Sequence, residues 1–153
     1  MHSTTSLVNT LREDHPHLTF MESEEFRWSP DTQTIFFDKS SRDFEAFILH
    51  ELGHALLKHR SYQHDIDLLK IERDAWAHAT VALADVYDVA IREEVIQDNL
   101  DTYREWLHSR SICPSCSATG LQSSKGLYVC LGCGVRWKSN EARNCALRRY
   151  TIA

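Results

Sequence analysis

Hydrophobic residues in the first third of the chain follow one helix-like and three strand-like patterns. Residues 4–13 carry apolar side chains at helical spacing, which predicts a short first helix. Short apolar runs follow at 18–21, 26–28 and 34–37, and turn-forming residues at 29–32 predict that the last two runs pair as a hairpin. The pattern therefore predicts a small sheet early in the chain.

After these runs the pattern changes to helical spacing. Apolar residues predict a helix over about 41–59, with Ser40 and Asp43 as a capping-box-like start. A second helix is expected over about 65–84. A third is expected over about 89–108, and its apolar stripe comprises Ile96, Leu100, Tyr103 and Leu107. Strands followed by a run of helices indicate an α+β fold.

Charge divides the chain into two parts of opposite sign. The 153 residues carry a net charge of −5. Residues 1–109 contain 10 basic and 21 acidic side chains, a net charge of −11, whereas residues 110–153 contain 7 basic and 1 acidic, a net charge of +6. This asymmetry predicts two domains, over 1–109 and 110–153, that have different partners.

The sequence predicts neither a targeting segment nor a membrane span. Residues 1–11 lack an apolar core next to positive charge, and no apolar stretch reaches the length of a bilayer-spanning helix. With 42% hydrophobic and 25% charged residues, the composition is typical of a globular protein. We therefore expect a cytoplasmic protein that does not enter membranes.

The helix predicted over 41–59 contains an H-E-x-x-H motif formed by His50, Glu51 and His54. Residues four apart lie on one face of a helix, so the two histidines can direct imidazole nitrogens at one metal ion. Glu51 is then placed to act as general base toward a metal-bound water. Because the flanking residues are apolar, burial of these polar side chains would be costly without a metal. The motif predicts a catalytic zinc site.

A catalytic zinc of this type requires a third protein ligand, and the candidates are His59, His64, Glu72 and Asp74. His59 is five residues beyond His54, about 140° around a continuous helix, and is expected to point away from the metal. Glu72 is favoured because it lies in an apolar stripe, where a carboxylate needs a partner. His64 is the main alternative, and Asp74 is expected on the solvated face. The stripe comprises Leu68, Glu72, Ala75, Ala79 and Leu83.

Two segments of the first part match motifs of a known family. Residues 44–59, FEAFILHELGHALLKH, resemble the active-site helix of the ImmA/IrrE metallopeptidases, and residues 71–77, IERDAWA, resemble their second motif. The resemblance covers about residues 18–84, although residues 79–84 lack the proline of the family pattern. It implies a small zincin-like fold and, because members with known roles remove repressors or act in damage responses, a regulatory protein as substrate. It also implies Glu51 as base and, as zinc ligands, His50, His54 and Glu72.

Four of the five cysteines form two C-x-x-C pairs separated by 13 residues. Two such pairs indicate a tetrahedral zinc site, and nearby glycines suit the turns of a zinc ribbon. Disulfides are the alternative, but they are not expected in the cytoplasm. A segment this small needs a metal to stabilise its fold, so this zinc is expected to be structural. The ligands would be Cys113, Cys116, Cys130 and Cys133, with Cys145 as a free thiol.

The C-terminal part also interleaves basic and aromatic residues. Trp137 and Tyr150 lie among Arg136, Lys138, Arg143, Arg148 and Arg149. Such a surface suits nucleic acid or an acidic protein partner. The alternative is that this basic tail docks on the acidic first part.

Together the motifs predict a zinc-dependent endopeptidase with an appended zinc ribbon, using one catalytic and one structural Zn²⁺. Tyr62, His64 and Tyr87 are candidates for stabilising the oxyanion. One alternative is a SprT-like protease acting on DNA-bound proteins, which also joins H-E-x-x-H to a zinc ribbon but would use a third histidine as ligand. The other is a regulatory or nucleic-acid-binding zinc protein without catalysis.

Overall fold

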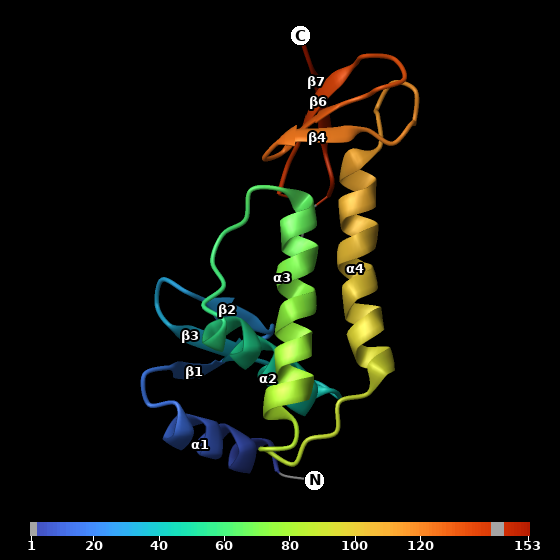
Figure 1. The fold of residues 1–153 in the computed structure, drawn as a ribbon. Coiled ribbons are helices and arrows are strands. Elements are labelled where there is room, and N and C mark those ends of the chain that lie inside the picture. The colour runs from blue at the N-terminus through green and yellow to red at the C-terminus, as the bar shows by residue number, and fades with distance from the viewer. Residues whose placement is uncertain (1–2, 142–145) are drawn as a thin grey trace. The chain divides into compact units, whose positions relative to one another are not determined.

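The structure, a computed structural model, describes residues 3–141 and 146–153, so the predictions made for Arg143 and Cys145 lie outside the described residues. The described residues form an α+β fold with four α-helices and two small sheets, as expected (Figure 1). None of the helices among them combines the length and the apolar character needed to cross a membrane. The chain divides into two compact units. The first unit comprises Met1–Arg60 and Ile71–Asp98, and the second unit comprises Ser61–Lys70 and Asn99–Ala153.

The sheet of the first unit has three strands in the order β1-β3-β2. β1 is parallel to β3 and β2 is antiparallel to β3, so the predicted hairpin is confirmed. The strand register places Phe20, Ile35 and Phe37 on one face, and all three side chains are buried in the core. The strands span Thr19–Glu22 (β1), Arg27–Ser29 (β2) and Thr34–Phe37 (β3).

Two helices, α1 (Thr4–Asp14) and α2 (Phe44–Leu56), pack against this sheet. Ser3 begins α1 by accepting a hydrogen bond from the backbone N–H of Ser6 (3.1 Å). The fully buried side chains of the core come from both helices and from β3, and they include Leu11, Ile35, Ile48, Leu49 and Leu52. The helix that carries the H-E-x-x-H motif is therefore a core helix, as its apolar flanks predict.

α2 is shorter than the helix predicted over 41–59. The predicted capping box is wrong, because Ser40 donates its hydroxyl hydrogen to Asp38 (2.6 Å) and takes no part in the helix start. Asp43 occupies the N-cap position without a side-chain capping hydrogen bond. At the other end, Lys58 has a left-handed backbone (φ 57°), which stops the helix just after its last turn.

α3 (Asp65–His78) continues into a short π-helical segment, η1 (Ala79–Leu83), so the helix predicted over about 65–84 is confirmed. The backbone N–H of Ala84 donates to the carbonyl of Ala79 (2.8 Å), five residues back, which is the wider π turn. α3 begins in the second unit, and its residues from Ile71 onward belong to the first. The predicted stripe is confirmed, because each of its members is at most 7% exposed: Leu68, Glu72, Ala75, Ala79 and Leu83.

The second unit contains the C-terminal part of α4 (Glu93–Ser111), which runs past the boundary predicted after residue 109, and a four-stranded antiparallel sheet. Trp137, predicted to lie on a basic surface, is instead fully buried, and that prediction is wrong. Its ring stacks on Tyr128 with centroids 5.5 Å apart, and its Nε1–H donates to the carbonyl of Arg110 (3.0 Å). Tyr150 is 51% exposed. The strands, in the order β4-β5-β6-β7, span Leu121–Ser124, Leu127–Val129, Arg136–Ser139 and Arg149–Ile152.

Candidate metal centres

α2 and α3 bring His50, His54 and Glu72 together in the first unit. His50 Nε2 lies 2.9 Å from Glu72 Oε2, His54 Nε2 lies 3.3 Å from the same oxygen, and the two Nε2 atoms are 3.1 Å apart. All three residues are buried. Three side chains from two helices therefore converge on one point, as helical phase predicts.

The spacing of these three atoms fits a tetrahedral metal site. Ligand atoms at about 2.0–2.1 Å from a tetrahedral metal are about 3.3 Å apart, and the observed separations are 2.9–3.3 Å. Two imidazole nitrogens and a carboxylate oxygen that face one another in a buried site need a shared proton or cation to offset their repulsion. The set thus fits a divalent cation, and it leaves one coordination position for water or substrate.

Burial and mutual contacts shift the protonation equilibria of these groups. Burial lowers the pKa of His50 to about 4, so its imidazole is neutral near pH 7 and can donate a lone pair. Burial alone would raise the pKa of Glu72, but hydrogen bonds with His50 and His54 outweigh it and hold that pKa well below its usual range. For His54, burial would lower the pKa, yet the hydrogen bond and charge of Glu72 raise it. The site therefore offers a metal one carboxylate and at least one neutral imidazole.

Glu51, which the H-E-x-x-H motif predicts to be the base, lies beside the two histidines. It is 8% exposed, and a carboxylate oxygen of Glu51 and one ring nitrogen of each of His50 and His54 all lie within 4.8 Å of one another. A carboxylate beside such a group can act as a proton acceptor. The arrangement therefore offers a metal-binding group and an adjacent proton acceptor.

Two residues that the motif does not include also shape the site. The indole of Trp76 stacks on the imidazole of His50, with centroids 4.2 Å apart and an interplanar angle of 22°, and so fixes the plane of that ring. Gly53 allows α2 and α3 to approach, because a Cβ atom there would lie 2.6 Å from the carbonyl oxygen of Ala75. Trp76 stands four residues after Glu72, on the same helix face, and this spacing is a signal that could have identified it.

His59 is placed differently from the sequence prediction, which assumed a continuous helix. Because α2 ends at Leu56, the chain turns, and His59 Nδ1 comes to lie 2.9 Å from His54 Nδ1. The helix predicted through residue 59 is therefore wrong, whereas the prediction that His59 points away from the metal stays a prediction. The contact is on the opposite side of the His54 ring from Nε2, so His59 can orient that ligand without joining the ligand set.

The other candidates have different surroundings. The side chain of His64 is 50% exposed, and its Nδ1 atom lies 3.8 Å from the Asp67 carboxylate. Asp74 forms an ion pair with Arg73 (3.3 Å), in agreement with the solvated face predicted for it. Tyr87 donates a hydrogen bond to Asp14 (3.0 Å). These contacts leave Glu72 as the residue that meets both motif histidines.

The second unit brings four cysteines together. The Sγ atoms of Cys113 and Cys133 are 3.7 Å apart, and those of Cys116 and Cys130 are 3.5 Å apart. Both separations are far beyond a disulfide bond of about 2.05 Å, and all four residues are free cysteines. Sulfur ligands about 2.3 Å from a tetrahedral zinc are about 3.8 Å apart. The four cysteines therefore form a second group that fits a metal.

Both C-x-x-C pairs fold into the same tight turn. The N–H of Ser117 donates to the carbonyl of Cys113 (3.0 Å), and the N–H of Gly134 donates to the carbonyl of Cys130 (2.9 Å). Ser117 and Gly134 are both left-handed, with φ of 64° and 78°. The backbone N–H of Cys133 points at Cys130 Sγ (3.4 Å) and lowers the pKa of Cys130 to about 6, which favours the metal-binding thiolate.

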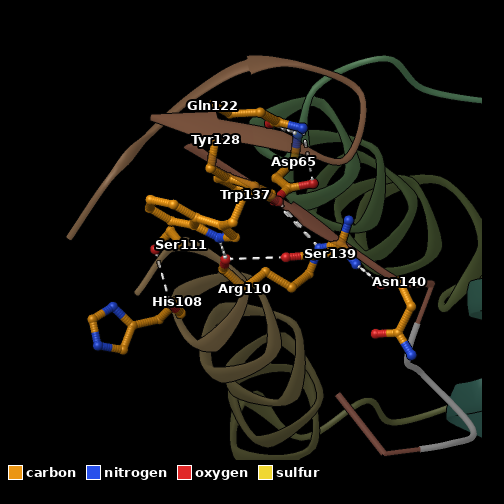
Figure 2. A network of polar contacts seen from close by, with 9 residues as sticks. All are labelled: Asp65, His108, Arg110, Ser111, Gln122, Tyr128, Trp137, Ser139 and Asn140. Carbon is orange, nitrogen blue, oxygen red and sulfur yellow. Dashed lines mark hydrogen bonds and ion pairs between the residues drawn. The ribbon is translucent and has the colours of Figure 1, made fainter. Parts of the chain in front are cut away.

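A buried arginine connects the elements of the second unit (Figure 2). Arg110, near the end of α4, is 1% exposed, and its Nε atom lies 3.2 Å from the Tyr128 hydroxyl and 3.6 Å from the Asp65 carboxylate. Tyr128 donates to the same carboxylate, and the carbonyl of Asn140 accepts from Arg110. Gln122 accepts a hydrogen bond from the Asp65 N–H (2.7 Å). One carboxylate thus neutralises the guanidinium and ties the start of α3 to the sheet.

Comparison of the chain with protein-family models, with curated proteins and with solved structures gave no match. The chemistry of the two sites is therefore the basis for assigning a function. One is a group of four sulfurs, and the other combines two imidazoles and a carboxylate with a second carboxylate beside them.

Proposed function

We propose that the protein is a zinc-dependent endopeptidase with His50, His54 and Glu72 as zinc ligands and Glu51 as general base. The observation that carries the proposal is the approach of three ligand atoms to within 3.3 Å of one another, next to the Glu51 carboxylate. Three protein ligands leave a fourth position open, which is characteristic of catalytic zinc and not of structural zinc. This combination supports hydrolysis of a peptide bond.

Each residue has a defined task in this mechanism. Bound zinc would supply a Lewis acid that polarises the scissile carbonyl and lowers the pKa of a water. Glu51 takes a proton from the attacking water and later passes it to the leaving amine. Trp76 holds the ring of His50 by stacking, and His59 contacts the far nitrogen of His54, so both Nε2 atoms stay in place.

The edge of the first sheet supports an extended peptide as substrate. β2 pairs with β3 on one side, and no other described strand pairs with it. Trp28 of β2 donates its Nε1–H to the carbonyl of His59 (3.0 Å), which places this strand beside the end of the metal helix. An extended segment can add to such an edge through main-chain hydrogen bonds. A substrate with an accessible, unfolded segment fits this edge.

The four-cysteine group completes the proposal as the structural zinc site of a zinc ribbon. Unpaired thiolates of this kind suit the reducing cytoplasm. Exposed basic residues give the ribbon a surface for nucleic acid or an acidic partner, and these are Arg136, Lys138, Arg148 and Arg149. The resemblance to the ImmA/IrrE family supports a regulatory protein, such as a transcriptional repressor, as substrate.

Zinc counting combined with a cleavage assay tests the proposal. The wild-type protein should bind two zinc ions and cleave an unfolded protein such as casein, whereas Glu51→Gln should bind two and cleave nothing. Glu72→Ala should retain one zinc ion, and His64→Ala, the matched control, should retain two. Equal cleavage by wild type and Glu51→Gln would refute the mechanism. Loss of zinc in His64→Ala would instead favour a third histidine ligand.

A further inference from the structure

A cavity of about 360 Å³ lies at the C-terminal end of α2, next to the candidate catalytic site. Its walls come from the last residues of α2 and those that follow it, from the β2–β3 hairpin and from His17. His59 lines the cavity and also contacts His54 (2.9 Å), so the cavity adjoins a metal ligand. Trp28 and Leu56 add an apolar part to the wall.

The charge of the cavity wall is opposite to that of the unit around it. The first unit contains 8 Lys/Arg and 17 Asp/Glu, a net charge of −9. The described residues that line the cavity include Lys58 and Arg60 and no acidic residue. Both side chains carry a full positive charge at neutral pH. The wall is therefore a local positive site within a negative unit, and such a site attracts an anionic group.

The cavity adjoins both the candidate site and the strand edge proposed for the substrate. His59 lines it and contacts His54 (2.9 Å), and Trp28 of β2 lines it as well. A peptide paired with β2 would therefore run past the cavity and could present a side chain to it.

We infer that this cavity is a specificity pocket for an aspartate or glutamate side chain of the peptide substrate, close to the cleaved bond. The carboxylate pairs with Lys58 and Arg60, and the methylene groups contact Trp28 and Leu56. The inference rests on the proposed peptidase function and adds its substrate class, a segment with an acidic residue close to the cleavage site.

Peptide binding to the zinc-loaded Glu51→Gln variant tests the pocket without catalysis. A library of random decapeptides is incubated with the variant, and the bound peptides are sequenced. We expect Asp or Glu to be enriched at one position, and replacement of that residue by its amide to weaken binding about five-fold at low salt. The difference should shrink as salt is raised. Absence of bound peptides, or binding without acidic enrichment, overturns the inference.

Variants that change the charge of the cavity wall test whether the cavity causes the preference for an acidic residue. Combined with Glu51→Gln, the changes Lys58→Asn and Arg60→Glu should abolish the acidic preference, and asparagine suits the left-handed backbone at position 58. Lys39→Asn is the matched control, because Lys39 is exposed, pairs with Glu22 (2.9 Å) and does not line the cavity. An unchanged preference in the pocket variant overturns the inference.

Cleavage of the same library by the wild-type protein separates this inference from the proposed function. Cleavage sites without an acidic residue within three positions would overturn the pocket and leave the peptidase intact. Absence of any cleavage would contradict the peptidase, while the binding experiment still decides whether the cavity takes an acidic side chain.

Discussion

Gly53 is a point at which the backbones of α2 and α3 are in contact, and Gly53→Ala tests whether that contact sets the metal site. A Cβ atom at this position would lie 2.6 Å from the carbonyl oxygen of Ala75 and 3.4 Å from its Cα. Both atoms belong to the backbone of α3, so no side chain can rotate to relieve the clash. Glu72 precedes Ala75 by one turn, so a displacement of α3 moves the metal ligand with it.

The required displacement is small but larger than a metal site tolerates. Restoring an ordinary contact of about 3.3 Å moves α3 by about 0.7 Å. That shift would lengthen the 2.9 and 3.3 Å separations of Glu72 Oε2 from the two imidazole nitrogens, whereas metal–ligand distances vary by about 0.2 Å. We expect zinc affinity at this site to fall about 10- to 100-fold. Overpacking costs about 1–3 kcal/mol, and the gain in helix propensity offsets about 1 kcal/mol of that cost. The free energy of unfolding should therefore fall by up to about 2 kcal/mol.

Competition with a fluorescent zinc chelator measures the affinity, and urea unfolding in excess chelator measures the stability. The four-cysteine site is an internal reference whose affinity should not change. Gly132→Ala is the matched control, because a Cβ atom there would lie 3.6 Å from its nearest neighbour, Cys130 Sγ. Helix propensity alone predicts the opposite sign for Gly53→Ala. Unchanged zinc affinity together with increased stability would refute the reasoning.

Three further predictions concern other parts of the chain. Asp65→Asn should lower the free energy of unfolding of the second unit by about 3 kcal/mol in urea titrations, because Arg110 would keep a buried charge without its carboxylate. Cys130→Ser should reduce the bound zinc from two ions to one, as counted by native mass spectrometry. Burial and the hydrogen bond to Asp14 raise the pKa of Tyr87 to about 12, so its stabilising contribution is complete below pH 10, the ordinary value, and is lost as pH rises toward 12. Tyr87→Phe should remove that part of the pH dependence of stability.

Matched variants separate these effects from general loss of fold. Asp67 and Tyr150 are exposed, so Asp67→Asn should be nearly neutral and Tyr150→Phe should keep the alkaline pH dependence. If Asp67→Asn lowered the free energy of unfolding as much as Asp65→Asn does, the effect could not be assigned to the buried pair of Asp65 and Arg110. Two zinc ions retained by Cys130→Ser would contradict the four-cysteine site. A stability curve that still falls between pH 10 and 12 in Tyr87→Phe would assign that fall to another group.

Helical phase was the most informative sequence signal for the site. Glu72 is a charged residue within an apolar stripe, and every position of that stripe is buried in the structure. Arg110 follows Leu107 by three residues and continues the stripe of α4, so the same criterion applies to it. The helical spacing of apolar residues depends only on the sequence of one helix. It can therefore be recognised without knowing which other elements that helix contacts.

Features that depend on where a helix stops could not be predicted in the same way. The sequence offers no glycine or asparagine at position 58 to signal the left-handed turn of Lys58, so a helix through residue 59 was expected and the contact of His59 with His54 was missed. Trp137 is a different case. Strand alternation buries it between the exposed Arg136 and Lys138, whereas the basic composition of the segment suggested a surface position.

The two candidate sites differ in the property that separates a structural metal from a reactive one. Four sulfurs fill a tetrahedron, whereas His50, His54 and Glu72 occupy three positions and leave one open. Thiolates select zinc more strongly than imidazoles and carboxylates do, and the mixed set also accepts Co²⁺ or Mn²⁺. Metal exchange should therefore act first on the site beside Glu51, where a substituted metal can be followed by its effect on cleavage. If the proposed assignment is correct, the second unit would stay folded during that exchange, because the metal proposed to support its fold is not the metal proposed to meet the substrate.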